Sequence, residues 1–526
     1  MDFGTAIGKL CLPLPPIIAG RHHLSMQMRS SASTKYLAIL AAAEVLYGVS
    51  CAPGALWQDS GLIQYRVWHN DIEGFLGLAI SHPLYYIVAI GAKLVPFGEV
   101  AHRVNLVSAL AAAVAVANLY LLIRLWLGAD FPAIIAAVTL AVSHTFWQHA
   151  SVAETYTLWT ALFLAELIML LQYTRTGKLS YLYLLGLLNG LAIAVHMLAA
   201  IAFVCYAAFI VLLLARRAIR VKDVAVIAGL WVLGALPYEY LIIKNIVAGG
   251  DIAGTLASAA FADRWRGDVL NTSLSWTIVK ENALFLALNF PTPNALLFFA
   301  GGYASYRTTH SRAFRNVLVA LLVLFLIFAF RYTVSDRYAF FIPFYSIVAI
   351  LIGLGAYEVV TQIRHKAVAY VIASCSLLPV IVYVAAPAIA ERMNLQIGTR
   401  GDLAYRNDYE FFLEPWKTGD TGADRFAAEA LSGAEPNAII LADTTTVGPL
   451  LFVQEVKGLR PDVKIITGIV SSQGAPPYDL KALEQLVGTQ PVYVTSSRPG
   501  YCPPFALEKC ELIKTGVLWR VLSSTP

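Results

Sequence analysis

The chain has 526 residues, of which 58% are hydrophobic and only 13% are charged, and its formal net charge is +5. A soluble domain cannot bury that much apolar surface, so the composition excludes a soluble globular protein and predicts a polytopic membrane protein. The small net charge gives no support for a nucleic-acid partner.

Apolar spans alternate with short polar loops through the first 387 residues. Each span approaches the roughly 20 residues that a helix needs to cross a bilayer. The segment 83–97 is shorter, and we predict that it lies in the membrane interface and does not cross. The sequence thus predicts an α-helical polytopic membrane protein with about eleven transmembrane helices. The predicted spans are 36–56, 104–126, 131–148, 151–172, 181–197, 199–215, 223–243, 284–304, 316–333, 339–360 and 367–387.

Basic residues in four short loops set the orientation of the chain. All of them fall on one side of the membrane only if segment 83–97 does not cross. Because cytoplasmic loops are enriched in Lys and Arg, we predict a multi-pass protein of the cytoplasmic membrane with its N-terminus in the cytoplasm. The loop 57–103 and the tail 388–526 then face the periplasm or the extracellular space. The basic residues are Arg175, Lys178, Arg216, Arg217, Arg220, Lys222, Arg307, Arg312, Arg315, Arg364 and Lys366.

The chain becomes polar after residue 387 and stays so to its end. Short apolar runs at 438–442 and 463–466 are typical of buried strands, and 426–431 and 446–456 are typical of helices. This alternation predicts a small soluble α/β domain over 388–526, after a membrane domain over 1–387. Its two cysteines, Cys502 and Cys510, either form a disulfide or remain thiols.

The loop 57–103 holds the most conspicuous carboxylate. Asp59 lies just beyond the first span, where Ser60 and Gly61 let the chain turn. Such a carboxylate either accepts a proton from an acceptor hydroxyl, binds a metal, or is a solvated loop residue.

Other ionisable groups lie at span ends, and each has two interpretations. Glu154 is either a site carboxylate or the capping-box partner of Ser151. Arg103 and Arg337 stand at outer ends of spans, where each is either a phosphate ligand or a snorkelling anchor. The outer loop 244–283 is expected to cover the site with its Asp263-Arg264-Trp265-Arg266 stretch.

Short motifs occur in an order typical of one enzyme family. On their residues the chain resembles the GT-C class of glycosyltransferases that use polyprenyl-phosphate sugars. Within that class it is similar to the transmembrane-protein-260-like family of O-mannosyltransferases. The motifs are W-Q-D-S-G-L at 57–62, H-P-L-Y-Y at 82–86, R-V-N-L-V-S-A-L at 103–110, the stretch from Phe146 to Tyr156, P-N-A-I-I-L at 436–441 and F-V-Q-E-V-K-G-L-R-P-D-V at 452–463.

This resemblance implies inverting transfer of a mannose-like hexose from a polyprenyl-phosphate donor to an acceptor hydroxyl on a protein Ser or Thr, or on a glycan. It implies that Asp59 is the catalytic base. No cofactor is expected, and Leu62, which stands where the family has Glu, argues against a metal-assisted or two-carboxylate mechanism. The implied substrate-binding residues are His82, Arg103, Glu154, Tyr156 and Arg337.

Two other functions fit the same elements. A transferase of this architecture acting on lipid A, teichoic acid or another glycan would tolerate deletion of the tail 388–526, because a small saccharide needs no docking domain. A transporter or flippase would use Glu44, Glu166 and His196 as a proton relay, and would need Glu44 but not Asp59. The absence of internal sequence repeats argues against the transporter.

The asymmetry of basic loops makes the topology testable. In intact cells, a cysteine introduced beside Arg216 is expected to be shielded from an impermeant thiol reagent, and one introduced beside Gly419 is expected to be labelled. Labelling beside Arg216 would contradict the predicted orientation.

Overall fold

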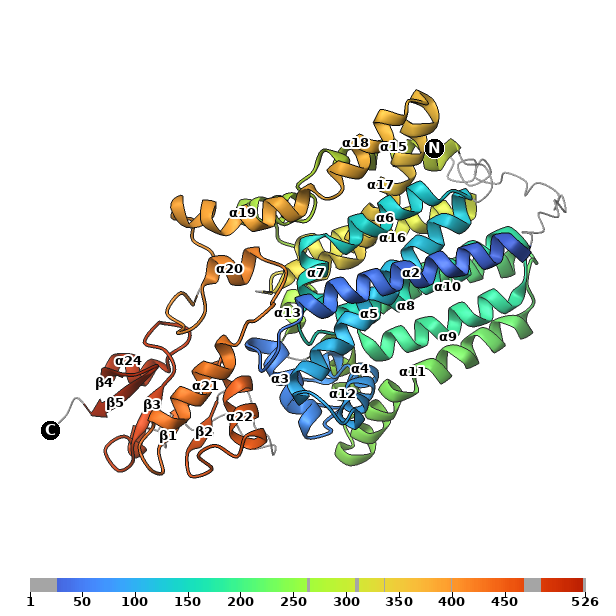
Figure 1. Cartoon of the computed structure of the whole chain (residues 1–526). Coiled ribbons are helices and arrows are strands. Elements are labelled where there is room, and N and C mark those ends of the chain that lie inside the picture. Colours follow the sequence, from blue (N-terminus) through green and yellow to red (C-terminus); the bar gives the residue numbers. More distant parts are fainter. Residues whose placement is uncertain are drawn as a thin grey trace.

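The computed structural model describes residues 26–262, 265–307, 312–334, 336–398, 400–467 and 484–523 (Figure 1). Its long helices form one bundle, and a smaller region containing a β-sheet lies beyond one end of that bundle (Figure 1). The predicted class, a helical membrane protein with a small C-terminal α/β part, is confirmed in outline.

Most described helices belong to the bundle. The others named here connect the bundle to the region that contains the sheet, and we call them the links. The bundle contains α2 (Met26–Ser50), α5 (Val100–Leu127), α6 (Asp130–Ala141), α7 (His144–Ala150), α8 (Tyr156–Thr176), α9 (Leu179–Val195), α10 (Ala199–Ala215), α11 (Val221–Gly249), α14 (Trp276–Asn289), η5 (Pro293–Leu296), α15 (Leu297–Arg307), α16 (Arg312–Arg331), η7 (Arg337–Phe341), α17 (Ile342–Ile363), α18 (Lys366–Cys375) and α19 (Leu378–Arg392). The links contain α3 (Gln58–Trp68), η2 (Leu78–Ile80), α4 (Pro83–Gly91), η3 (Ala92–Leu94), α12 (Ile252–Phe261) and α13 (Arg266–Val269).

Among the described residues, six helices are long and apolar enough to cross a membrane, or up to eight if each of two bent helix pairs is one span. The bent pairs are α6 with α7, at 70°, and α14 with the η5–α15 segment, at 112°. α9 and α10 have 17 residues each, fewer than a spanning helix usually has. The predicted count of eleven spans is therefore not confirmed.

The segment predicted to lie in the interface forms the short helices α4 and η3. The apolar stretch Leu78–Leu94 that contains them is too short to count as a span. Leu94 at its end is 86% exposed, and Phe97 just beyond it is 74% exposed. An apolar, exposed and short helical segment fits a position in the plane of the interface.

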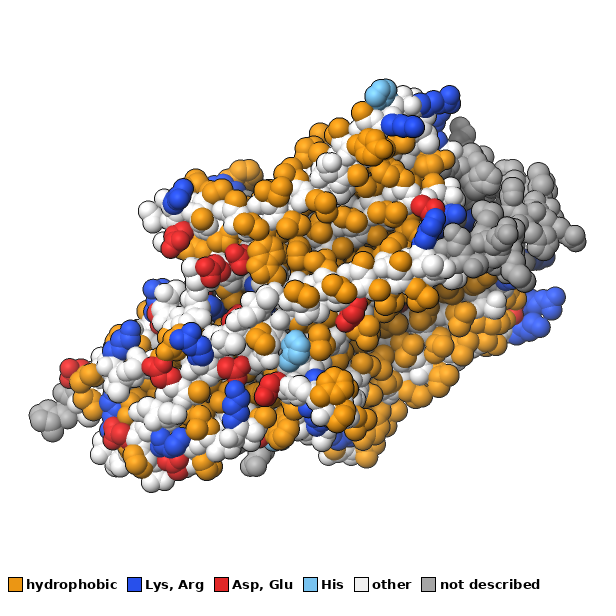
Figure 2. Space-filling view, viewed as in Figure 1, with side chains coloured by type: hydrophobic (Ala, Val, Ile, Leu, Met, Phe, Trp, Pro, Cys, Tyr) orange, Lys and Arg blue, Asp and Glu red, His pale blue; other side chains and the backbone are white. Residues whose placement is uncertain are grey.

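Hydrophobic side chains cover most of the bundle on the face seen in Figure 2, whereas Lys, Arg, Asp and Glu gather over the C-terminal region. Soluble proteins rarely expose so large an apolar surface, which is expected where helices contact lipid. The direction in which the chain crosses the membrane stays a prediction.

Five strands form one sheet in the C-terminal region, in the order β2-β1-β3-β5-β4. β1 pairs in parallel with β2 and β3, and β5 pairs antiparallel with β3 and β4. The predicted runs 438–442 and 463–466 are β1 and β2, so both strand predictions are confirmed. The elements are β1 (Ile439–Leu441), β2 (Lys464–Ile466), β3 (Val492–Val494), β4 (Cys510–Thr515), β5 (Leu518–Ser523), α20 (Asp408–Leu413), α21 (Gly422–Gly433), α22 (Val447–Val456) and α24 (Pro504–Lys509).

Two further features of this region bear on the sequence analysis. Cys502 and Cys510 are both free thiols in the structure, so they do not form the disulfide that was one of the two alternatives. The region also shares a hydrophobic cluster with α3 and the residue before it, because Trp57 and Leu62 are buried together with Phe426 and Leu450. The domain boundary at residue 387 stays a prediction.

Inside the bundle, α9 and α11 pack with their backbones almost touching. A Cβ atom on Gly234 would lie 2.7 Å from the backbone nitrogen of Leu191 and closer still to the carbonyl oxygen of Leu187. Small residues at such crossings let transmembrane helices approach closely and gain van der Waals contact.

We expect Gly234→Ala to lower the free energy of unfolding by about 1–3 kcal/mol, because the added methyl group forces α9 and α11 apart. Gly229→Ala, in the same helix, has no atom within 4 Å of its new Cβ and should be neutral or slightly stabilising. Thermal unfolding of the two purified variants in the same detergent measures the difference. Equal melting temperatures would show that the close contact is not needed.

Candidate active site

Asp59 lies in the first turn of α3, just after a sharp change in chain direction. Gln58 has φ 56°, in the left-handed region that residues other than Gly seldom adopt. The Asp59 side chain is accessible to solvent, yet the surrounding protein desolvates its carboxyl group and raises its pKa. This combination is expected for a group that lines an enclosed site with an opening.

Two more carboxyl groups face Asp59, and they come from distant parts of the chain. Glu154 precedes α8, and Asp336 immediately precedes η7. Each is an electrostatic neighbour of Asp59, and they are neighbours of each other. We call Asp59, Glu154 and Asp336 the acidic cluster.

Hydrogen bonds hold Glu154 in place beside α3. The Ser60 hydroxyl donates to its Oε1 at 3.2 Å. Its backbone N–H donates to the Ser108 hydroxyl oxygen at 2.9 Å. Ser151 is not its capping partner: the Ser151 hydroxyl donates to the carbonyl of Trp147, and the next helix begins only at Tyr156. The capping-box interpretation is therefore wrong, because Ser151 ends α7 and the N-cap of α8 is Thr155.

Burial raises the pKa of every member of the acidic cluster, and repulsion from neighbouring acids adds to this effect for Glu154 and Asp336. Desolvation is the larger cause for Asp336, and the nearby Asp59 adds to it, so that the pKa of Asp336 rises to about 7. Desolvation, then Asp59 and Asp336, raise the pKa of Glu154 well above its usual value. The cluster therefore retains protons near neutral pH and titrates as a coupled unit. Within the described part of the chain, no group of His, Cys, Asp and Glu has the arrangement of a metal site.

Aromatic rings and imidazoles pack beside the acidic cluster. The Tyr156 ring lies at the centre, with its centroid 4.9 Å from His196 and 5.1 Å from His149. His196 in turn stacks on His82 at 4.7 Å, and His149 contacts Tyr338 at 5.8 Å. We call Tyr156, His196, His149, His82 and Tyr338 the ring cluster. Tyr156 and Tyr338 are both electrostatic neighbours of all three acids.

The histidine of the H-P-L-Y-Y motif has a fixed orientation. His82 is the N-cap of α4, with φ 52°, and its Nδ1 lies 2.8 Å from the carbonyl oxygen of Val195. Burial, and then the positive charge of Arg66, lower the pKa of His82 to about 4. The ring is therefore neutral at pH 7 and offers its other nitrogen or its face to a ligand.

Arg66 was overlooked as a candidate, although the sequence places it in the same outer loop as Asp59. Its guanidinium lies 3.7 Å from the centroid of the Tyr86 ring and donates to the Tyr86 hydroxyl at 2.8 Å. It also forms an ion pair with Asp71 at 3.2 Å. Tyr86 is an electrostatic neighbour of Asp59 and Glu154, so Arg66 lies just behind this edge of the site.

The two predicted phosphate ligands have other contacts in this structure. The Nη1 of Arg103 donates to three backbone carbonyls at the end of η3, including that of Lys93 at 3.1 Å. Arg337 is buried and pairs with Glu281, and its guanidinium lies 5.4 Å from the Phe285 ring centroid. The structure therefore assigns Arg103 a bracing contact and leaves the phosphate role of both residues a prediction.

Three other positions bear on the sequence predictions. Leu62 is buried in the cluster shared with the C-terminal region, so it contributes to packing between α3 and that region. Asp336 was missed, although an acid beside Arg337 at the outer end of a span was a usable signal. Of the stretch expected to cover the site, Asp263 and Arg264 lie outside the described residues.

Comparison with known proteins supports the resemblance found in the motifs. Residues 78–220 match the family model described as the protein O-mannosyl-transferase TMEM260 N-terminal domain. The matched range includes His82, Arg103, Glu154 and Tyr156, but not Asp59. Among curated proteins, no sequence matches the chain.

The overall fold resembles that of a solved structure at low sequence identity. The crystal structure of ArnT from Cupriavidus metallidurans bound to undecaprenyl phosphate superposes with a TM-score of 0.58 at 15% identity, over 93% of this chain and 98% of that one. The archaeal oligosaccharyltransferase AglB from Archaeoglobus fulgidus, in complex with an inhibitory peptide and a dolichol-phosphate, gives a TM-score of 0.43 at 15% identity, over 82% and 64%. The likeness to ArnT shows a shared fold, and with the family match it confirms the predicted resemblance.

The raised pKa of Asp336 makes a stability prediction that does not depend on function. Because the folded state holds this proton more tightly than the unfolded state, whose Asp pKa is about 3.9, the contribution is fully present below pH ~4. It is lost as pH rises through about 7. Asp336→Asn removes this loss, so its melting temperature relative to wild type should rise between pH 5 and pH 8.

Glu99→Gln, at an exposed residue, is the matched control and should show no such trend. Thermal unfolding at several pH values in one detergent measures both variants. A constant difference between Asp336→Asn and wild type would contradict the raised pKa.

Proposed function

We propose that this membrane glycosyltransferase, which carries a segment of the protein O-mannosyl-transferase family, performs inverting transfer of a mannose-like hexose. The donor is a polyprenyl-phosphate sugar, and the acceptor is a hydroxyl group, in the first instance of a protein Ser or Thr. The observation that carries the proposal is the acidic cluster, assembled from three segments beside the ring cluster.

Asp59 is the proposed base. It is the member of the acidic cluster that lies in the first turn of a helix and is open to solvent, so an acceptor can reach it. The acceptor oxygen attacks C1 of the sugar, and its proton passes to the Asp59 carboxylate. The bond between C1 and the phosphate oxygen breaks, and polyprenyl phosphate leaves with the bonding electrons.

The neighbouring acids and rings are suited to hold the sugar. Glu154 and Asp336 retain protons near neutral pH, so each can both donate to and accept from sugar hydroxyls. Because Glu154 and Asp336 are partly protonated, Asp59 ionises more easily than it would beside two charged carboxylates. The faces of Tyr156 and Tyr338 offer apolar contact to the C–H face of a pyranose ring.

The leaving phosphate needs fixed positive charge nearby. Of the two predicted arginines, Arg337 adjoins Asp336 in the chain and keeps a planar guanidinium in a buried position. Arg103 remains a candidate, with one nitrogen engaged by the carbonyls of η3. The structure of ArnT is with undecaprenyl phosphate, which supports a lipid phosphate as the carrier here.

The reaction is proposed to occur at the outer face of the cytoplasmic membrane, where the loop 57–103 and the tail 388–526 would meet the acceptor. A lipid or cell-envelope glycan is the alternative acceptor. Incubation of the purified protein with labelled polyprenyl-phosphate hexoses, followed by tracing of the label to protein, glycan or lipid, decides between them. A flippase would move the lipid without cleaving the sugar and would need Glu44 but not Asp59.

We expect Asp59→Asn to fold, to bind polyprenyl-phosphate hexose and to transfer the sugar at least about a hundredfold more slowly, since a positioned base is worth about 10²–10⁴ in rate. The amide keeps the shape of the side chain and removes the base. Single-turnover transfer with labelled donor measures the rate, and equilibrium binding measures donor affinity.

The control must remove a carboxylate from the same outer loop without disturbing its structure. Asp71 is unsuitable, because it pairs with Arg66 and accepts the backbone N–H of Gly74 at 2.8 Å. Glu99→Gln is preferable, because Glu99 is exposed. Wild-type rates in Asp59→Asn, or equal losses in both variants, would show that Asp59 is not the base.

A further inference from the structure

The turn that presents Asp59 is in direct contact with the C-terminal region. The Trp57 side chain is 2% exposed, and its ring centroid lies 5.4 Å from that of Phe426 in α21. The backbone N–H of Ala55 donates to Asp424 Oδ2 at 2.8 Å. Chain segments separated by more than 360 residues thus pack together next to the proposed base.

One backbone hydrogen bond fixes the residue before Asp59. The N–H of Gln58 donates to the carbonyl oxygen of Thr445 at 3.0 Å. Gln58 is the residue with φ 56°, a conformation that persists only when its surroundings impose it. Because Asp59 is the next residue, the direction of its side chain depends on this contact.

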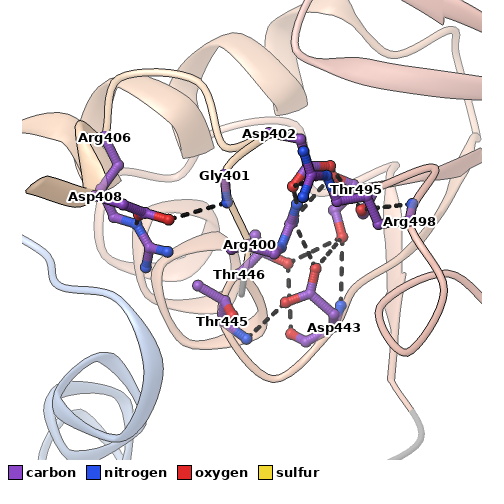
Figure 3. Close-up of polar contacts among 11 residues, drawn as sticks. Arg400, Gly401, Asp402, Arg406, Asp408, Asp443, Thr445, Thr446, Thr495 and Arg498 are labelled. Atoms are coloured by element: carbon purple, nitrogen blue, oxygen red, sulfur yellow. Dashed lines mark hydrogen bonds and ion pairs between the residues drawn. The ribbon is translucent and has the colours of Figure 1, made fainter. Parts of the chain in front are cut away.

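Thr445 is itself held by a buried polar network at the carboxyl ends of the inner strands β1 and β3 (Figure 3). Its N–H donates to Asp443 Oδ1 at 2.7 Å. The other oxygen of Asp443 accepts from Arg400 at 2.8 Å and from the Thr495 hydroxyl at 2.9 Å. Asp443 and Thr495 follow the parallel strands β1 and β3, so the sheet sets where Thr445 lies.

A second contact sets the distance between the two parts. α3 and α22 cross where Gly61 meets Gly448. A Cβ atom on Gly448 would lie 2.6 Å from the carbonyl carbon of Gly61 and 2.7 Å from the nitrogen of Leu62. No side chain larger than hydrogen fits at Gly448 unless α3 shifts.

We infer that the C-terminal region is a positioning part of the active site, and that Gly448 and Asp443 orient Asp59 against Glu154 and Asp336. The inference rests on the proposed function and deepens it. The inference also predicts a different result for deletion of the tail. Removal of residues 388–526 would remove the contacts that orient Asp59, and transfer to any acceptor would be lost. Tolerance to deletion therefore cannot distinguish a protein acceptor from a glycan.

The test compares two identical substitutions in the same region, Gly448→Ala and Gly433→Ala. Gly433 ends α21 and has no atom within 4 Å of a new Cβ. Both full-length variants are assayed for single-turnover transfer from labelled polyprenyl-phosphate hexose, for donor KM and for melting temperature. For Gly448→Ala we expect transfer to slow by about tenfold to a hundredfold with donor KM within about twofold of wild type, since a shift of about 1 Å has such an effect. Gly433→Ala should match wild type in all three.

Asp443→Asn is the second variant, because it alters the network without adding volume at the helix crossing. It should give the same pattern of slower transfer and unchanged donor KM. Wild-type transfer in a folded Gly448→Ala would overturn the inference, and so would parallel losses of rate, donor affinity and folding in both variants. Failure of wild type to transfer any labelled hexose would instead refute the proposed function.

Discussion

The repulsion among three carboxyl groups is the constraint on which this site depends. Asp59, Glu154 and Asp336 are electrostatic neighbours in a desolvated setting, where like charges cost far more than in water. Such an arrangement persists only if the rest of the molecule holds each group in place and some of the groups stay protonated. The surrounding hydrogen bonds and helix contacts are arranged around that requirement.

Each acid is held by a different part of the fold. Glu154 is fixed by hydrogen bonds to Ser60 of α3 and Ser108 of α5. Asp336 lies in the turn just before η7, which continues into α17. The first four turns of α17 are fully buried. Asp59 is set by the C-terminal sheet through Thr445. The site therefore forms only when the bundle and the C-terminal region are both folded and in contact.

This division has a chemical consequence for sugar transfer. A base must be ionised while its neighbours bind a polar substrate, and environments that push the pKa values of paired acids apart achieve this. In the proposed mechanism, Glu154 and Asp336 hold protons and the solvent-accessible Asp59 is the group that an acceptor would reach. The ring cluster gives the site aromatic faces for contact with a sugar. Its His82 is neutral at pH 7, so this residue adds no charge.

The sequence alone determined the class of the protein, because apolar composition and span length follow from local residue content. It also identified the β1 and β2 strands and the motifs shared with the O-mannosyl-transferase family, since both are patterns in neighbouring residues. The predicted number of spans is not confirmed, because α6 with α7 and α14 with α15 bend sharply where hydropathy stays high, and because α9 and α10 are shorter than a usual span.

Only the tertiary structure decided what surrounds Asp59. Asp336 and Glu154 lie far from it in the chain, and no periodicity links them, so their meeting is a property of helix packing. The burial of Leu62 against the C-terminal region was equally hidden, since one apolar residue in a polar loop has no visible partner. The physical reason is the same in both cases: residue type sets which groups can interact, whereas long-range contacts between helices and sheet set which groups do.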